Sequence, residues 1–499
     1  MAKYYMGLDQ GTTGTTVLIL DEDWNMLSRG YKEHTQYYPK PGWVEHDPLE
    51  IWGSILETVD QAAEKAGVTN LEEIACMGLD NQGETVVLWD NVTGVPVYNA
   101  IVWQDKRTAK EADEIAAKYK DMIREKTGLV VDAYFSATKI KWVIDNVPGV
   151  KEKIARNRIN AGTLDSWMIW KLTHGRVFVT DRSTASRTML FNIHTGDWDD
   201  EILSILDIPR SILPEIRDSA EVYGTTDPLD FFGARIPISG SVVDQQAALF
   251  GQVCFEPGTV KTTYGTGCFM LMNTGDKPIY SPNGLLTTVG WGLDKGRMTY
   301  ALDGGIYIAG AAVQWLRDKM RIITSAAETE EIAKSVENTG DVFFVPAFSG
   351  LAAPHWDQYA RGTIVGITGG TTREHIIRAT LESMAYQVKD NLDVMVGDSN
   401  IQIEAMRVDG GASVHGFLMQ FQADILGIPV DVPEIIETTA LGAAYLAAYG
   451  IGEFKSLDDI KGKWKLKKRY EPQMDEATRT KLLDKWHKAV ERAKTWADD

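Results

Sequence analysis

The sequence predicts an α/β protein with two similar domains, and two observations carry this fold class. Stretches with the pattern of β-strands alternate with amphipathic helical stretches along the 499 residues. In addition, a unit of strand, glycine- and threonine-rich turn, and second strand occurs twice, about 250 residues apart. The repeat predicts two α/β domains that face one another, and the length agrees, because about 150 residues per domain is usual.

The two repeated units lie at the start of the chain and just past its middle. In the first unit, strands are expected over residues 3–9 and 15–21; in the second, they are expected over 258–263 and 268–272. We place the domain boundary beside Leu249–Gly251, which predicts an N-terminal domain of residues 1–249 and a C-terminal domain of residues 250–499.

Five helices follow from hydrophobic spacing and from capping signals. Asp47 followed by Pro48 is a typical helix start, because Asp accepts from free N–H groups and Pro fits the first turn. The last helix is highly charged but keeps Leu482, Leu483, Trp486 and Val490 at helical spacing. The helices are expected over residues 48–66, 107–126, 139–146, 373–396 and 475–496.

Composition excludes several classes of protein. The 51 Lys and Arg against 70 Asp and Glu give a formal charge of −19, which argues against nucleic-acid binding through bulk charge. The hydrophobic fraction of 44% excludes wholesale disorder. The start of the chain lacks a secretion-signal pattern, and no apolar run is long enough to cross a membrane. We therefore expect a cytoplasmic enzyme that is not inserted in a membrane.

The three cysteines give no sign of a special site. Cys76, Cys254 and Cys268 are odd in number, widely spaced and outside any CxxC pair. This arrangement excludes a disulfide framework and gives no support to a zinc site.

The turn of the first repeated unit has the composition of a phosphate and metal site. Asp9 at the strand end could hold Mg²⁺, while Gly11 admits backbone N–H groups close to an anion, and Thr12 and Thr13 add hydroxyl donors. The competing interpretation is an ordinary hairpin turn. The second such turn, Tyr264–Gly267, and the paired glycines of Val408–Ala412 favour the nucleotide site. Neither GxxxxGK[ST] nor GxGxxG occurs in the required context.

Two further patterns are candidates for catalysis and substrate binding. Asp244 lies at a strand-to-helix junction, where it could take the proton of an attacking hydroxyl or could cap the helix. Trp103 and Phe269 could wall a small pocket in which Glu84 and Gln245 bind hydroxyls, although with 15 Trp in the chain a place in the core is the alternative.

Longer segments resemble the FGGY family of carbohydrate kinases, and within that family the glycerol kinases. Residues 134–142 (Tyr-Phe-Ser-Ala-Thr-Lys-Ile-Lys-Trp) and the segment from Gly362 to Glu382 are similar to the two signatures of the family. The resemblance runs nearly end to end and includes residues 38–48, 185–192 and 244–251.

The resemblance implies a fold and an activity. It implies two actin/Hsp70-like, ribonuclease-H-type domains with a cleft between them, which close over ATP–Mg²⁺ and a polyol. The implied activity is the ATP-dependent phosphorylation of a primary hydroxyl, with the conversion of glycerol to glycerol 3-phosphate as the first expectation. A homodimer or homotetramer is also implied, because both are common in the family.

The resemblance also assigns roles to individual residues. It makes Asp244 the catalytic base and gives Asp9 the magnesium ion. The residues expected at the polyol are Gly83, Glu84, Trp103, Tyr134, Asp244, Gln245 and Phe269. The residues expected at the phosphates and the rest of the nucleotide are Gly11, Thr12, Thr13, Thr266, Gly267, Gly310, Gln314, Gly411 and Ala412.

Departures from the family pattern bear on the substrate. Gly83 stands where glycerol kinases have an arginine that donates to glycerol, and Thr16 and Gly369 also stand where arginines are usual. Glu84 is therefore expected to lack its positive neighbour. Two interpretations stay open: glycerol with a compensating donor elsewhere, or a longer polyol or an amino- or otherwise substituted alcohol. A non-enzymatic nucleotide switch is disfavoured, because Asp9 and Asp244 are both present.

Overall fold

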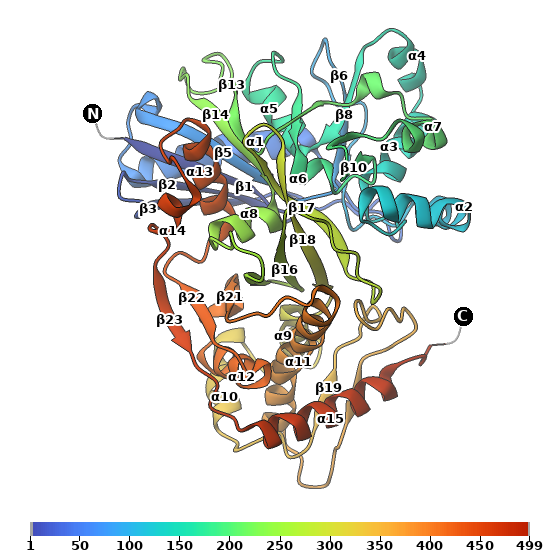
Figure 1. The fold of residues 1–499 in the computed structure, drawn as a ribbon, viewed down its shortest axis with the longest axis vertical. Coiled ribbons are helices and arrows are strands. Elements are labelled where there is room, and N and C mark those ends of the chain that lie inside the picture. The colour runs from blue at the N-terminus through green and yellow to red at the C-terminus, as the bar shows by residue number, and fades with distance from the viewer. Residues whose placement is uncertain (1–2, 498–499) are drawn as a thin grey trace.

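The computed structural model describes residues 3–497 and contains two α/β units, each built around one mixed β-sheet (Figure 1). The blue-to-green first half of the chain lies above most of the second half in Figure 1, although α13 and α14 lie beside the first half. The α/β class and the two-unit organisation predicted from the sequence are both confirmed.

The first unit is built on a six-stranded sheet. Strands β1 to β3 form an antiparallel meander, and β5 and then β14 add to β1 in parallel. In spatial order the strands are β13 (Ala220–Thr225), β14 (Pro237–Val243), β5 (Ile74–Asn81), β1 (Tyr4–Gln10), β2 (Gly14–Leu20) and β3 (Met26–Glu33).

The second unit repeats this arrangement in a seven-stranded sheet. Its strands β15, β16 and β18 run antiparallel, β21 and β22 add to β15 in parallel, and β23 is antiparallel to β22. In spatial order the strands are β17 (Leu286–Leu293), β18 (Arg297–Ile306), β16 (Cys268–Gly275), β15 (Val260–Tyr264), β21 (Met406–Asp409), β22 (Val430–Pro433) and β23 (Leu466–Tyr470). The two sheets therefore share one pattern, so the faint sequence repeat marks a true structural repeat.

Smaller ladders and the helices complete the fold. A four-stranded sheet in the first unit contains β4 (Glu45–His46), β7 (Ala100–Ile101), β6 (Val86–Asp90) and β8 (Ile159–Thr163). Three two-stranded ladders pair β10 (Phe191–Asn192) with β11 (Asp197–Trp198), β12 (Glu215–Arg217) with β9 (Val179–Asp181), and β19 (Phe343–Val345) with β20 (Thr363–Val365).

The helices pack on the two large sheets, on the smaller ladders and on one another. The α-helices of the first unit are α1 (Pro48–Ala66), α2 (Ala109–Thr127), α3 (Ser136–Asn146), α4 (Val150–Ala155), α5 (Leu164–Leu172), α6 (Arg182–Ala185), α7 (Asp200–Leu206) and α8 (Asp244–Gly251). Those that follow are α9 (Gly310–Asp318), α10 (Thr329–Lys334), α11 (Arg373–Ser399), α12 (Gly416–Leu426), α13 (Thr438–Gly450), α14 (Leu457–Lys461) and α15 (Glu476–Ala493).

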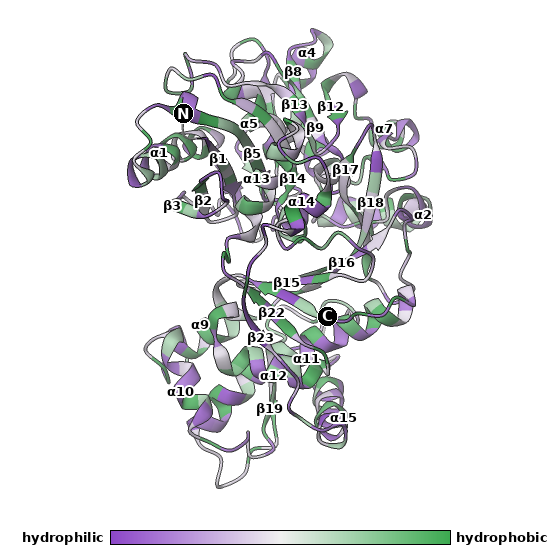
Figure 2. Ribbon diagram, turned by 60° about the vertical axis from the view of Figure 1, so that its left-hand side comes forward, coloured by the Kyte–Doolittle hydropathy of each residue, from purple (hydrophilic) through white to green (hydrophobic). Residues whose placement is uncertain are grey.

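The expected helices agree with the observed ones to within a few residues. Asp47 accepts from the N–H of Leu49 at 2.8 Å and caps α1, as its position before Pro48 predicted. Helix α15 carries alternating purple and green bands in Figure 2, and its inner face buries Trp486 and Val490. Within residues 3–497, no helix is both long and apolar enough to cross a bilayer.

Helix α13 lies on the sheet of the first unit, although it belongs to the last quarter of the sequence. Figure 1 shows this red-orange helix beside the blue strands. Gly7, Gly78 and Gly240 are aligned in register across β1, β5 and β14. A Cβ atom at Gly7 or Gly78 would overlap a carbonyl oxygen of α13, and one at Gly240 would lie 2.6 Å from the backbone nitrogen of Ala447. The helix backbone therefore rests directly on the strand backbones.

The same helix also contacts α8 backbone to backbone. A Cβ atom at Gly251 would overlap the carbonyl oxygen of Thr438, and one at Gly442 would overlap that of Ala247. The expected domain boundary at residues 249/250 falls in the last turn of α8 and stays a prediction. In space, α13 crosses this boundary and joins the two halves of the chain.

We predict that Gly78→Ala destabilises the protein by about 3 kcal/mol or more, because the new methyl group must push α13 away from the sheet. The matched control is Gly53→Ala in α1, where a Cβ atom meets nothing within 4 Å. That change should stabilise the protein by about 1 kcal/mol through helix propensity. Chemical denaturation measures both, and equal effects of the two changes would contradict the close-packing argument.

Candidate active site

Three carboxyl groups meet at one edge of the first sheet. Asp9 lies at the end of β1, Asp80 at the end of β5, and Asp244 directly after β14. The parallel register pairs Asp9 with Asp80 and Asp80 with Val242. Because the carboxyl ends of neighbouring parallel strands lie side by side, the fold itself brings these groups together.

Burial and mutual repulsion disfavour ionisation of these carboxyl groups. Burial raises the pKa of Asp9 to about 6, and the nearby Asp244 adds to this shift. The pKa of Asp80 is raised well above its ordinary value by burial, by the charge of Asp9 and by a hydrogen bond with Asp9. Burial also raises the pKa of Asp244, against the opposing effect of Lys261. A bound cation, or protons shared between these carboxyl groups, would therefore be favourable at this place.

The turn between β1 and β2 lies next to these carboxyl groups. The N–H of Gly11 donates to the carbonyl of Gly14 at 3.0 Å, which closes a tight turn with Thr12 and Thr13 at its tip. Asp9 accepts from the hydroxyl of Thr439 at 3.0 Å. Since Thr439 is in the first turn of α13, the N-terminal end of that helix points at the same place.

The residues expected on the nucleotide side lie at the matching edge of the second sheet. Thr266 and Gly267 form the turn after β15, and Gly310 begins α9 with its N–H donating to the carbonyl of Gly265 at 3.1 Å. Gln314 is exposed one turn further along α9. The remaining two expected residues, Gly411 and Ala412, form a 3-10 turn after β21. Because β15 and β21 are adjacent and parallel, these segments are neighbours.

The residues expected at the polyol gather beside Asp244. The indole N–H of Trp103 donates to the Thr12 hydroxyl at 2.9 Å, and its ring meets that of Tyr134 edge to face with centroids 5.6 Å apart. Gln245 follows Asp244 in α8, and its side-chain oxygen accepts from the Lys261 ammonium at 2.5 Å. Trp103 thus connects the phosphate turn to the pocket.

Phe269 lies in β16 opposite Gly305, where a Cβ atom would be in ordinary van der Waals contact with the phenyl ring. Gly83 is in the turn between β5 and β6, directly before Glu84. All the residues expected at the polyol therefore lie around one region, and their roles remain predictions.

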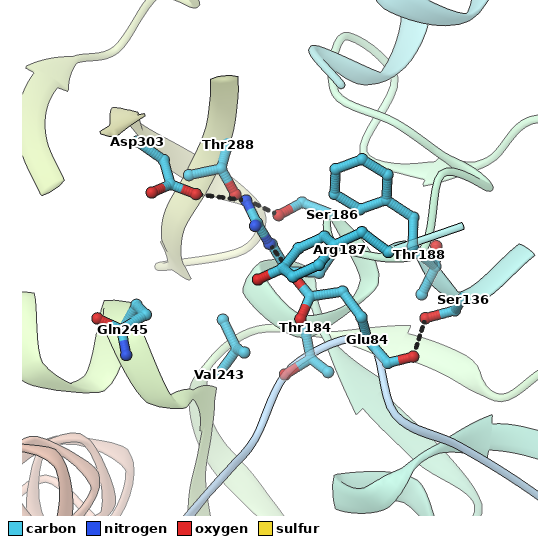
Figure 3. Close-up of polar contacts among 12 residues, drawn as sticks. Glu84, Ser136, Thr184, Ser186, Arg187, Thr188, Val243, Gln245, Thr288 and Asp303 are labelled. Carbon is cyan, nitrogen blue, oxygen red and sulfur yellow. Dashed lines mark hydrogen bonds and ion pairs between the residues drawn. The ribbon is translucent and has the colours of Figure 1, made fainter. Parts of the chain in front are cut away.

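Glu84 has a positive neighbour, contrary to the expectation from Gly83. Its Oε1 accepts from Nε of Arg187 at 2.7 Å, and Nη1 of Arg187 lies 3.0 Å from Oδ2 of Asp303 (Figure 3). Glu84 adopts a left-handed backbone conformation with φ of 59°. The expectation was wrong because a guanidinium arrives from residue 187, about 100 residues away in the sequence, and contact at that distance leaves no local signal.

The capping interpretation of Asp244 is not what the structure contains. Val243 is the N-cap of α8, and Asp244 is the first helical residue. Oδ1 of Asp244 does accept from the N–H of its neighbour Gln245 at 2.7 Å. One oxygen is therefore occupied locally, and the side chain remains beside the carboxyl cluster and the Glu84–Arg187 pair.

Lys261, Arg187 and Asp303 belong to this region but were not among the expected site residues. Lys261 is fully buried in β15, which places a positive charge near Asp244. Arg187 lies inside a segment that carried the family resemblance, and this was the one signal that could have indicated it. Lys261 lies within a strand pattern and Asp303 stands alone, so neither residue belongs to a motif that could have indicated it.

Known protein families and relatives match this chain over nearly its whole length. The pattern of the FGGY family of carbohydrate kinases, N-terminal domain, matches residues 4–251, and that of the C-terminal domain matches residues 260–451. The chain belongs to the FGGY family of carbohydrate kinases. The glycerol kinase 2 of Thermotoga maritima is 58% identical over 495 residues, which cover 99% of both chains. The glycerol kinase of Thermus thermophilus is 54% identical, again over 99% of both chains.

Solved structures extend this similarity. A Plasmodium falciparum glycerol kinase with ADP superposes with a TM-score of 0.91 at 39% identity, covering 99% of this chain and 98% of that one. A gluconate kinase from Lactobacillus acidophilus, at 22% identity and a TM-score of 0.85 over 98% of this chain and 97% of that one, shares the fold. The two-domain α/β architecture is thus that of the FGGY kinases.

The carboxyl edge of this FGGY kinase is suited to magnesium. Mg²⁺ takes oxygen ligands and is commonly bound by one or two carboxylates together with substrate phosphates. Asp9 offers such a carboxylate, and Asp80 lies in the paired position on the next strand. Within residues 3–497, no three His, Cys, Asp or Glu side chains form a ready-made ligand set. The residues present therefore fit an ion that arrives with a phosphate ligand.

We predict that the catalytic efficiency for the alcohol falls as the pH drops below about 7. Burial raises the pKa of Glu84 to about 7, while Arg187 and Lys139 oppose this shift and Asp244 adds to it. Glu84 accepts from a hydroxyl when it is ionised, so protonation below its pKa removes the acceptor. The measurement is kcat/KM for the alcohol at saturating ATP from pH 5.5 to 8.5. A flat profile, or the same acid limb in Glu84→Gln, would contradict this assignment.

We also predict that Asp80→Asn raises the thermal stability of the nucleotide-free protein, and that the gain grows from pH 4 to 7. The raised pKa of Asp80 favours its protonated form in the folded state, whereas the unfolded carboxyl loses its proton near pH 4. Stability from this group is therefore lost as the pH rises, and an amide has no such loss. The midpoint of unfolding, measured in a chelator at each pH, should diverge between the two proteins; parallel curves would exclude a protonated Asp80.

Proposed function

We propose that the protein transfers the γ-phosphoryl group of ATP to a primary hydroxyl of glycerol and produces glycerol 3-phosphate. One observation carries the proposal: Asp244 is near enough to both the Asp9–Asp80 carboxyl pair and the Glu84–Arg187 ion pair for its charge to raise the pKa of Asp9 and of Glu84. A base in that position faces a phosphate-binding edge on one side and a hydroxyl-binding pocket on the other.

In this proposal Asp244 accepts the proton of the attacking hydroxyl. The bond from the substrate oxygen to the γ-phosphorus forms as the bond to the bridging oxygen of ADP breaks, and the proton passes to the carboxylate of Asp244. Burial raises the pKa of Asp244, which makes it a stronger base than an exposed aspartate. Lys261 and the N–H of Gln245 oppose this shift and favour the ionised form.

The rest of the reaction depends on alignment and on charge. Asp9 would hold Mg²⁺, which neutralises phosphate charge when it is bound. Thr12 and Thr13 would donate to phosphate oxygens from the first turn, and Thr266 and Gly267 from the second. The Trp103–Thr12 hydrogen bond supports this arrangement, because it fixes the distance between the phosphate turn and the substrate pocket.

Glycerol is favoured over the longer or substituted alcohol that Gly83 suggested. The relatives at 54–58% identity are glycerol kinases. The absent arginine was the reason for the alternative, and Arg187 pairs with Glu84 instead. Because Glu84 is matched by a fixed cation, a cationic amino-alcohol would bring a second positive charge into a buried site, which is unfavourable.

Two finer expectations accompany the proposal. We keep the homodimer or homotetramer as a prediction. We also keep a cytoplasmic location, which the three buried and unpaired thiols of Cys76, Cys254 and Cys268 support, since disulfides are rare in that compartment.

The test of the proposed function is ATP consumption with glycerol together with identification of the product. Asp244→Asn should lower kcat by about 10²- to 10⁴-fold, the usual contribution of a general base, while ATP affinity stays within a few fold. Calorimetry or fluorescence measures ATP binding. Turnover close to wild type in Asp244→Asn would exclude this base, and lack of glycerol turnover in the wild type would exclude glycerol as substrate.

A further inference from the structure

A side chain at position 83 would require Val243 to move. A Cβ atom at Gly83 would lie 2.9 Å from Cγ2 of Val243, which is closer than real Cβ contacts allow. Val243 is a β-branched residue at the buried end of β14, so it has little freedom to turn away. Val243 thus occupies the space that a side chain at position 83 would need. A cationic side chain is therefore not expected to reach the pocket from residue 83.

Arg187 supplies a cation at the same place from another direction. Its Cγ is the next atom that a Cβ at Gly83 would meet, at 4.0 Å. The guanidinium is nearly buried, with 6% of the side chain exposed, and its Cζ lies 6.0 Å from the ring centre of Tyr134. Figure 3 shows it between Glu84 and Asp303.

The guanidinium retains unused donors in this position. Arginine has five N–H groups, and among the described residues the side chain donates one hydrogen bond, from Nε to Glu84. Nη1 is buried and within 3.0 Å of Asp303, but this ion pair lacks hydrogen-bond geometry. A buried N–H without an acceptor is costly, so a hydroxyl group placed here would gain from accepting it.

We propose that Arg187 is the residue that binds and orients the substrate's non-reacting hydroxyls, and that Val243 enforces this by excluding a side chain at Gly83. Glu84 holds the guanidinium from the first unit, and Asp303 in β18 holds it from the second. Arg187 thus determines specificity for adjacent hydroxyl groups. The inference rests on the proposed phosphorylation of glycerol and adds the residue that selects this substrate.

The first experiment compares wild type with Arg187→Lys, which keeps the charge and loses the planar fork of donors. The KM for glycerol should rise about ten- to hundredfold, the usual effect of losing a charge-assisted hydrogen bond, while the KM for ATP stays within twofold. Arg182→Lys is the matched control. Arg182 lies five residues earlier and pairs with Asp218 at 3.0 Å, so the glycerol KM should not change. An unchanged glycerol KM in Arg187→Lys, or an equal rise in both KM values, would overturn the proposal.

The second experiment removes the substrate hydroxyl that is proposed to accept a hydrogen bond from Arg187. Propane-1,2-diol and propane-1,3-diol each lack one hydroxyl of glycerol, and kcat/KM is measured for both proteins with all three alcohols. With the diol that lacks the contacted hydroxyl, the ratio of wild type to Arg187→Lys should fall to about one to three. A ratio that is the same for all three alcohols would mean that Arg187 acts only through the fold.

Two further outcomes are an Arg187→Lys variant that does not fold and a wild type that does not consume glycerol. If Arg187→Lys does not fold, as judged from its thermal unfolding, Asp303→Asn takes its place, because it loosens the guanidinium at nearly constant shape. Its glycerol KM should rise several-fold with ATP KM unchanged, and no rise would overturn the proposal. If the wild type does not consume glycerol, the proposed function fails, and the same ratios are measured with whichever alcohol of the panel it does phosphorylate.

Discussion

The site depends on direct backbone contact between helix α13 and the first sheet. Gly7, Gly78 and Gly240 line up across three neighbouring strands, and the absence of three side chains lets the helix rest on them. This contact fixes the position, relative to α13, of the strand ends that carry Asp9, Asp80 and Asp244. It also brings the N-terminal end of α13 to Asp9 through Thr439. A structural requirement for glycine therefore positions the acidic groups that the chemistry needs.

The sequence predicted a large part of this arrangement, for physical reasons. Helix starts such as Asp47–Pro48 are local, and the two glycine- and threonine-rich turns follow directly from their strands, so their positions could be read from short segments. The Arg187–Glu84 pair could not, because it forms between segments about 100 residues apart. The course of α13 back to the first sheet was also outside local reasoning, since its alanine-rich sequence fits many packing partners.

The pocket contains positive and negative side chains from both units. Glu84 and Asp244 are negative groups of the first unit, Arg187 lies beside them, and Lys261 and Asp303 come from the second. Each charge is buried and each has an opposite charge near it, which is the condition under which buried charges are tolerated. The arrangement is complete only when β15 and β18 are in place against the first unit. Substrate binding and the relative position of the two units are therefore coupled through the same residues.

The return of α13 also has a consequence for synthesis. The strands of the first sheet are complete at Val243, but the helix that covers their glycine-lined face ends only at Gly450, roughly 200 residues later. At about 5–20 residues per second, this delay lasts on the order of 10–40 s on the ribosome. During that time the glycine-lined face of the first sheet lacks the cover that α13 provides. The contact between α13 and the strand glycines can therefore form only after almost 90% of the chain has been made.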